Sequence, residues 1–214
     1  MKFLSRQRNT SLGCPLRYTR VIRVIVRRHA RGFTLVELMI TLAVAAILLV
    51  IAVPSFQNMI ASNRLITTAN ELVGAINVAR MEAIKRNNST QFCSNTTANN
   101  TGDTLGAACS AITPSSGAVV VQTGGNPATV QVRAGAAGLT LPVQLHGDIV
   151  AIRFNGQGLG YQAGTTSAPF DSTSTGTPVA DICTPPISSS NNHVVINMTA
   201  GSIITTTPSK GACP

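Results

Sequence analysis

The hydrophobic positions divide the chain into parts with different periodicities. From Phe33 to Val53 the 21 residues are apolar except for Thr34, Glu37 and Thr41. As a helix this stretch spans about 31 Å at roughly 1.5 Å per residue, which is enough to cross the apolar core of a bilayer. The pattern therefore predicts a transmembrane helix near the N-terminus.

After Pro54 the apolar residues recur every three or four positions, as on one face of a helix. These residues are Leu65, Ala69, Leu72, Ile76, Ala79 and Ala83. We expect Glu82 to pair with Arg86 one turn later, and the helix to end at 87–89, where Asn and Ser side chains compete for backbone hydrogen bonds. The sequence thus predicts one helix of about 50 residues, kinked at Pro54, whose amphipathic half packs on the chain's own β-sheet.

Residues 89–214 alternate short β-branched runs with loops rich in Ser, Thr, Asn, Gly and Pro, a pattern typical of β-strands. The predicted strands are Thr90–Cys93, Ala118–Thr123, Thr129–Arg133, Ile149–Asn155, His193–Met198 and Ser202–Thr207. Asn155-Gly156 marks a turn, and residues 94–117 and 164–192 are predicted to be long polar loops. The expected fold is α+β: a long kinked N-terminal helix packed on a C-terminal antiparallel β-sheet or sandwich.

The charge is distributed unevenly. Of the 16 Lys and Arg residues, nine lie in residues 1–32, which contain no acid, and seven remain to balance all seven Asp and Glu. The net charge of +9 therefore gives no basic surface on the folded part, and the sequence does not indicate a nucleic-acid binder. The positive charges before the apolar span predict a cytoplasmic N-terminus and a C-terminal domain on the other side of the membrane.

Three interpretations of the apolar span compete. A cleaved secretory signal has a shorter core and a small-residue cleavage site, whereas the candidate site near Ala52 is followed by Pro54. An uncleaved signal anchor explains the length but not Glu37, because a carboxylate inside an apolar span costs about 2.5–3.5 kcal/mol.

The third interpretation comes from a resemblance. Gly32-Phe33-Thr34-Leu35-Val36-Glu37-Leu38 resembles the class III signal of type IV pilins and type II secretion pseudopilins. The resemblance implies that a prepilin peptidase cleaves between Gly32 and Phe33, that Phe33 is N-methylated, and that Glu37 faces the N-terminal amine of a neighbouring subunit. Pairing the amine with the carboxylate leaves neither charge unpaired in apolar surroundings. Pro54 also lies where many pilin helices carry a proline.

The resemblance also implies an organisation for the whole chain. The expected segments are a cleaved basic leader (1–32), the transmembrane half of the helix (33–53), its amphipathic half (54–88) and a globular β-rich pilin domain (89–214). A leader of this length is long for the family, and a true start near Val24 or Val26 is one hypothesis.

Four cysteines remain once Cys14 leaves with the leader, and they face an oxidising compartment where disulfides are expected. Three pairings are possible. We favour Cys93–Cys109 and Cys183–Cys213, because each closes a local loop.

The sequence offers little for chemistry. Residues 156–160 read G-x-G-x-G, but a Thr/Ser-rich loop follows instead of the helix that a dinucleotide site needs. His146 and Asp148 lie two residues apart in the sequence, without a nucleophile motif, and His193 is expected to be a surface or half-buried residue. Without a Cys-x-x-Cys pair, a metal site is disfavoured. We expect no metal, no cofactor and no enzymatic activity.

Residues 149–161 resemble the strand-Phe-x-x-x-Gly region of the GspH/FimT branch of pseudopilins and minor pilins, and the hairpin at 194–206 and the terminal Cys213 fit that branch. This resemblance implies a structural subunit: a minor pilin at or near the tip of a type IV pilus that supports pilus assembly. The alternative is a GspH-type minor pseudopilin of a type II secretion system. The expected disulfides and Thr-rich loops favour the pilus.

A DNA receptor for natural transformation is a further alternative. Some FimT-type pilins bind DNA through a C-terminal Gly-Arg-x-Arg element, but Gly201-Ser202-Ile203-Ile204 lacks both arginines and Lys210 is the only positive charge nearby. Because phosphate contacts supply most non-specific affinity, DNA binding is expected to be weak or absent. The expected partners are the prepilin peptidase and other pilins or pseudopilins, first in the inner membrane and then in an extracellular pilus or a periplasmic pseudopilus.

Overall fold

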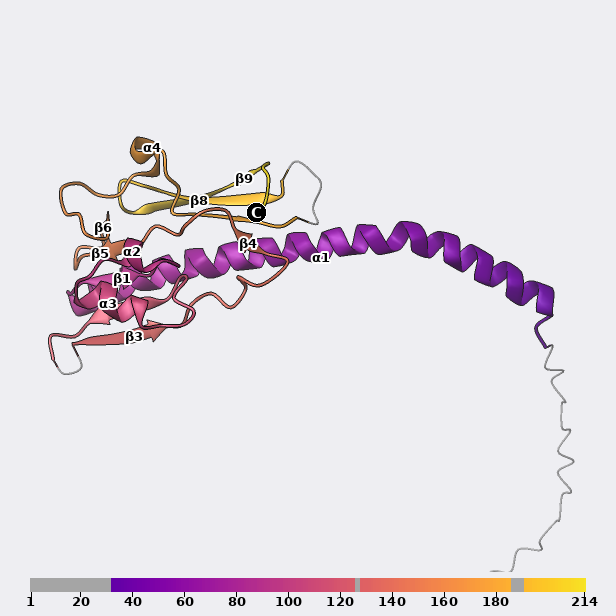
Figure 1. Ribbon diagram of the computed structural model, residues 1–214, viewed down its shortest axis with the longest axis horizontal. Coiled ribbons are helices and arrows are strands. Elements are labelled where there is room, and N and C mark those ends of the chain that lie inside the picture. Colours follow the sequence, from indigo (N-terminus) through magenta and orange to yellow (C-terminus); the bar gives the residue numbers. More distant parts are fainter. Residues whose placement is uncertain (1–31, 126–127, 186–190) are drawn as a thin grey trace, which may run out of the picture. The chain divides into compact units, whose positions relative to one another are not determined.

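The computed structural model describes residues 32–125, 128–185 and 191–214 (Figure 1). The chain divides into two compact units, Met1–Val44 and Ala45–Pro214. In chain order the elements are α1 (Leu35–Arg86), β1 (Thr90–Phe92), α2 (Thr97–Asn100), α3 (Thr104–Ser110), β2 (Val119–Gln122), β3 (Thr129–Arg133), β4 (Gln144–Leu145), β5 (Ile152–Phe154), β6 (Gly160–Gln162), α4 (Ser172–Thr175), β7 (Ala180–Cys183), β8 (His193–Thr199) and β9 (Ile203–Ser209).

The long helix has the length that the sequence predicts. It contains 52 residues, includes Pro54, and ends at Arg86. Asn87 follows with a positive φ of 46°, which a helix cannot continue. Glu82 accepts a hydrogen bond from Arg86 Nε at 2.7 Å, so the predicted pair is confirmed. The kink at Pro54 stays a prediction.

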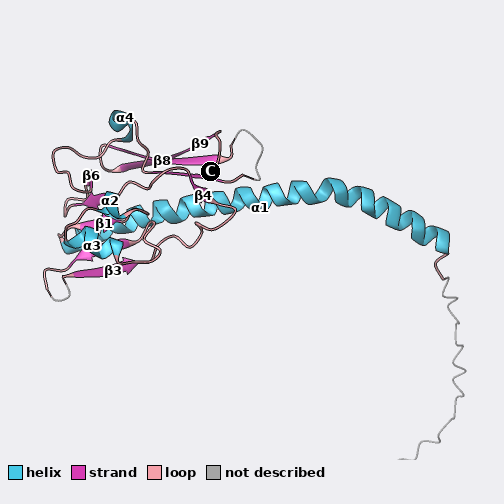
Figure 2. Cartoon of the chain, viewed as in Figure 1, coloured by secondary structure: helices cyan, strands magenta, loops and turns pink. Residues whose placement is uncertain are grey.

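The strands form two antiparallel sheets (Figure 2). The five-stranded sheet has the order β3-β2-β1-β5-β6, and the four-stranded sheet has the order β4-β7-β8-β9. The β5–β6 hairpin turns through Asn155-Gly156, as predicted, with Phe154 opposite Gly160. The observed architecture is the expected α+β arrangement of a long helix with antiparallel sheets.

The second part of α1 packs against both sheets of its unit. Every residue of the predicted apolar stripe is buried, and the same core contains Phe92 and Phe154 from one sheet and Ile182 and Ile196 from the other. At Gly117 the backbone has a positive φ of 74°, and a Cβ there would lie only 2.7 Å from Leu72 Cδ2. Glycine therefore allows the chain entering β2 to approach the helix closely.

The two predicted polar loops are partly wrong. Residues 94–117 contain α2 and α3, and residues 164–192 contain α4 and β7. The helix α3 is short, but Asp103 caps it by accepting a hydrogen bond from Gly106 N at 3.0 Å. Strand β7 contributes only four residues, yet it pairs with β4 on one side and β8 on the other. Tertiary contacts thus order segments whose local sequence predicts loops.

Candidate functional site

The segment around the predicted cleavage site lies at the start of α1. Residues 32–34 precede the helix and have no regular secondary structure. Thr34 caps the helix: its Oγ1 accepts a hydrogen bond from Glu37 N at 3.2 Å, and its carbonyl accepts one from Leu38 N at 3.1 Å. The Thr-x-x-Glu spacing is that of a capping box, of which the structure forms the half made by the Thr34 side chain. The cap therefore fixes Glu37 in the first turn, where a carboxylate also suits the helix dipole.

Large apolar side chains cover the first part of α1. Leu35, Leu42 and Leu48 in the helix, and Phe33 just before it, are all exposed by more than half of their surface. Among the described residues, α1 is the one helix whose length and apolar composition suffice for a membrane span. Thr41 is a polar residue within this surface, and its hydroxyl is satisfied by donating to the Leu38 carbonyl at 2.9 Å. This surface has the composition of one that contacts lipid or other apolar helices.

Glu37 differs from the other acids of the chain. The six other carboxylates each accept a hydrogen bond from a neighbouring group; they belong to Glu71, Glu82, Asp103, Asp148, Asp171 and Asp181. The Glu37 carboxylate has no hydrogen-bond or ion-pair partner within residues 32–125, 128–185 and 191–214. A carboxylate on an apolar helix needs a positive partner, and none of the described residues supplies it.

Two family models match the sequence at these features. The model of the type II transport protein GspH matches residues 68–201, which is more than half of the chain. The chain belongs to the GspH family. The prokaryotic N-terminal methylation motif matches residues 27–53, which include Gly32, Phe33 and Glu37. Searches of curated proteins and of solved structures gave no significant match.

The two matches establish the class of protein. A GspH domain behind an N-terminal methylation motif makes this chain a minor pilin or pseudopilin of the type IV pilin-like class. The motif implies processing by a prepilin peptidase and assembly with other pilins. The apolar N-terminal helix fits a protein anchored in the inner membrane.

The four cysteines of the described chain form two disulfides. Cys93 is bonded to Cys109, with their Cα atoms 5.5 Å apart, and Cys183 is bonded to Cys213, with Cα atoms 5.8 Å apart. These are the two pairs that the sequence analysis favours. The first joins the end of β1 to α3, and the second joins β7 to the C-terminal tail.

Of the two histidines in the folded domain, His193 lies differently from what the sequence predicts. Asp148, two residues from His146, accepts hydrogen bonds from Asn95 and Asn99. His193 is only 2% exposed, so its expected surface or half-buried position is wrong. The chain around Gly211 covers its ring: a Cβ on that glycine would lie 2.8 Å from His193 Nε2.

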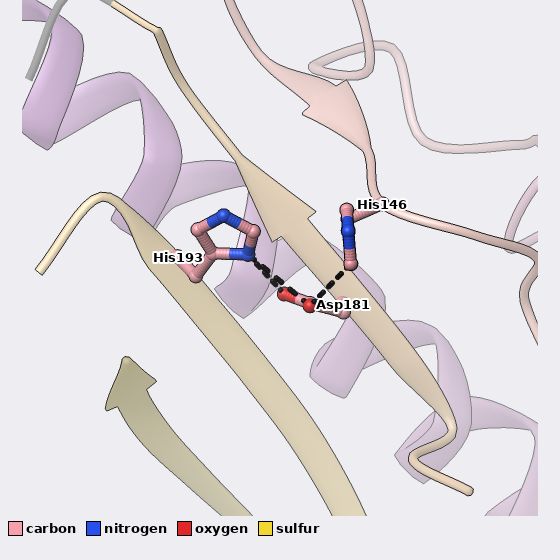
Figure 3. A group of neighbouring side chains, drawn as sticks. All are labelled: His146, Asp181 and His193. Carbon is pink, nitrogen blue, oxygen red and sulfur yellow. Dashed lines mark hydrogen bonds and ion pairs between the residues drawn. The ribbon is translucent and has the colours of Figure 1, made fainter. Parts of the chain in front are cut away.

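Sequence reasoning missed Asp181, which both histidines contact. His146 Nδ1 lies 3.1 Å from Asp181 Oδ2, and His193 Nδ1 lies 3.1 Å from each Asp181 oxygen (Figure 3). Asp181 falls in a segment predicted to be a loop. The apolar residues on either side of it, Ala180 and Ile182, are the one local signal that could have indicated a strand.

Most basic side chains of the folded part are engaged with the chain itself. Five of the seven after the leader contact partners within their own unit: Arg80, Lys85, Arg86, Arg133 and Arg153. At the Gly201-Ser202 turn, for example, Arg80 Nη1 donates to the Ser202 carbonyl at 3.1 Å. The described surface therefore offers few cations for phosphate contacts.

Proposed function

We propose that this chain is a minor pilin that enters a type IV pilus at or near its tip and supports pilus assembly. The observation that carries the proposal is Glu37, the one acid without a partner among the described residues, placed by Thr34 in the first turn of an apolar helix. The partner that we propose is the N-terminal amine of a neighbouring subunit. Pairing the two groups neutralises both charges in apolar surroundings.

Processing supplies that amine. We propose that the prepilin peptidase cleaves between Gly32 and Phe33 and that Phe33 is then N-methylated. A Cβ at Gly32 would meet no described atom within 4 Å, so the packing of the chain does not require glycine there. In this proposal, glycine at position 32 serves recognition by the peptidase. The basic leader remains in the cytoplasm and the domain after the span lies in the periplasm.

Two features favour the pilus over the secretion pseudopilus. Both disulfides lie in the folded domain, and one of them fixes the C-terminal tail, as suits a subunit exposed outside the cell. The exposed residues of the edge strand β9 include a row of threonines, Thr205 to Thr207. The family name, a type II transport protein, keeps a minor pseudopilin as the second candidate.

An enzymatic role and DNA reception are not favoured. The pilin-like class is structural. For DNA, the segment Gly201-Ser202-Ile203-Ile204 forms a turn and the start of β9 without an arginine, and most cations of the domain already have partners.

The test is a clean deletion of the gene, with surface pili and secreted exoproteins scored in the same cultures. We expect loss of pili with intact secretion, and restoration by the wild-type gene. Retained pili with exoproteins trapped in the periplasm would overturn the pilus assignment and place the protein in a secretion pseudopilus.

A further inference from the structure

We propose that His146, Asp181 and His193 form a binding site for a divalent transition-metal ion, represented by Zn²⁺. The proposal goes beyond the filament role and does not depend on which filament the chain enters. Two imidazoles and one carboxylate are donors that zinc commonly takes in proteins. One ligand atom from each residue lies within 4.8 Å of the other two.

The register of the four-stranded sheet brings these side chains together. Gln144 is opposite Cys183 and Leu145 is opposite Ile182, and the His146 amide then donates to the Asp181 carbonyl at 2.9 Å. His146 and Asp181 are therefore cross-strand neighbours, whose side chains lie on the same face of an antiparallel pair.

The third ligand comes from the next strand. Asp181 is opposite Val195 in the β7–β8 pair. His193 lies two residues from Val195 and is therefore the diagonal neighbour of Asp181 on the same face. Strands β7 and β8 thus supply one ligand each and the residue after β4 supplies the third, and Figure 3 shows the two histidines on either side of the carboxylate.

The distances suit a metal with a small adjustment. Zn–N and Zn–O bonds of about 2.0–2.2 Å in a tetrahedron place ligand atoms about 3.3 Å apart. The two His–Asp separations, 3.1 Å each, are close to that value. The two rings stand edge to face with centroids 5.1 Å apart, and the ligand atoms of the group lie within 4.8 Å of one another. A metal therefore requires the two imidazole nitrogens to approach each other by up to about 1.5 Å. The His146 side chain is 52% exposed and can make that movement.

Burial gives the site an enclosed side and an open side. His193 is buried and Asp181 is nearly so, whereas His146 faces solvent and offers the route of entry. The nearby Cys183 and Cys213 do not compete for the metal, because they are bonded to each other in a disulfide. Three protein ligands leave one tetrahedral position for water.

One feature limits the affinity. A metal on Nδ1 leaves the ring proton on Nε2, and His193 Nε2 is buried without a hydrogen-bond partner among the described residues. Loss of such a supporting partner lowers metal affinity by about 10- to 100-fold. We therefore expect micromolar rather than nanomolar binding.

The test uses the full chain in detergent, purified without a histidine tag. His29, the third histidine of the sequence, is replaced by alanine in every sample, so that His146 and His193 are the only imidazoles. Calorimetric titration with ZnCl₂ is expected to give one ion per chain. His146→Ala and Asp181→Asn should each lower the zinc affinity by at least about 10-fold, the smallest loss typical when a supporting partner of a metal ligand is removed. Asp148→Asn, a carboxylate two residues from His146 but outside the group, should leave the affinity unchanged.

Zinc-edge X-ray absorption of the zinc-loaded His29→Ala chain provides a readout that does not depend on the folding of the site variants. We expect two imidazoles and oxygen ligands at about 2.0–2.2 Å. Absence of saturable binding, affinity unchanged in both site variants, or a spectrum without imidazole would overturn the proposal and leave the group as a hydrogen-bonded His–Asp–His cluster.

Discussion

The two parts of α1 place the same kinds of side chain in opposite environments. Leu48, in the apolar part, is 62% exposed, whereas Leu72, in the amphipathic part, is completely buried. Around Leu72 the core contains residues from both sheets. Around Leu48 the neighbouring large side chains, such as Ile47 and Leu49, are exposed as well. The amphipathic part finds its apolar partners in its own chain, and the apolar part needs them from outside it.

Charged groups also differ along the chain. Glu82 pairs with Arg86, and Arg153 pairs with Asp103, all within the second unit. Glu37, in the first unit, has no partner among the described residues. Both comparisons lead to one inference: the folded domain is largely self-sufficient, while the N-terminal part of the helix is built to be completed by a membrane and by other subunits.

The largest expected effect comes from removing the charge that the chain leaves unpaired. In Glu37→Ala, the amine of the neighbouring subunit loses its proposed partner, and an uncompensated buried charge costs about 3–5 kcal/mol. Incorporation into filaments should fall by more than about 100-fold at that cost, while cleavage of the leader continues. Immunoblots of sheared filaments and of membranes measure both.

The matched control is Glu82→Gln, on the same helix. It removes a pair on the solvent-exposed side that contributes only about 0.3–0.5 kcal/mol, so incorporation should stay near wild type. Normal incorporation of Glu37→Ala would contradict the assembly role.

Truncation of leucine tests the apolar side of the comparison. Leu72→Ala removes a fully buried side chain and should lower the free energy of unfolding by about 2–5 kcal/mol. Leu48→Ala removes an exposed side chain and should change it by less than about 0.5 kcal/mol. Denaturant unfolding of both chains in detergent, followed by circular dichroism, measures the difference. Equal losses would mean that the two parts of α1 are not distinct.

The sequence predicts the regions whose stability is set locally. The stripe from Leu65 to Ala83 has a helical period, and the whole stripe is buried. Each of the six predicted strands overlaps a strand of the structure, because runs of β-branched residues suit a half-buried sheet. Helix termination at Asn87 was also predictable from side chains that compete for the backbone.

The regions that sequence reasoning missed depend on distant contacts. Strand β7 has two apolar residues facing the core, Ala180 and Ile182, and is ordered by strands on both sides. The contact of Asp181 with His146 spans 35 positions, and no local pattern indicates it. His193 was placed wrongly because the tail around Gly211 covers its ring. The β8–β9 pairing, with His193 opposite Ser209, and the Cys183–Cys213 disulfide hold this tail in place.

The smallest expected effect concerns a charge that the folded domain does satisfy. Asp103 accepts hydrogen bonds from Arg153, and this interaction lowers the pKa of the carboxyl from 3.8 to about 2. Because the pKa is depressed in the folded state, the stabilisation is fully present above pH 3.8 and is lost as the pH falls through about 2. The pair is partly exposed, so its contribution should not exceed about 1 kcal/mol.

Asp103→Asn tests this interaction without removing the helix cap, since asparagine also caps α3 well. At pH 7 the variant should melt slightly below the wild-type chain, and the two melting temperatures should converge between pH 4 and pH 2, as the wild-type carboxyl takes up its proton. Thermal melts across that range measure the difference. A gap that stays constant down to pH 2 would show that the Asp103 charge does not stabilise the fold. The contrast between Glu37, whose charge is unpaired among the described residues, and the paired carboxylates of the folded domain would then not extend to Asp103.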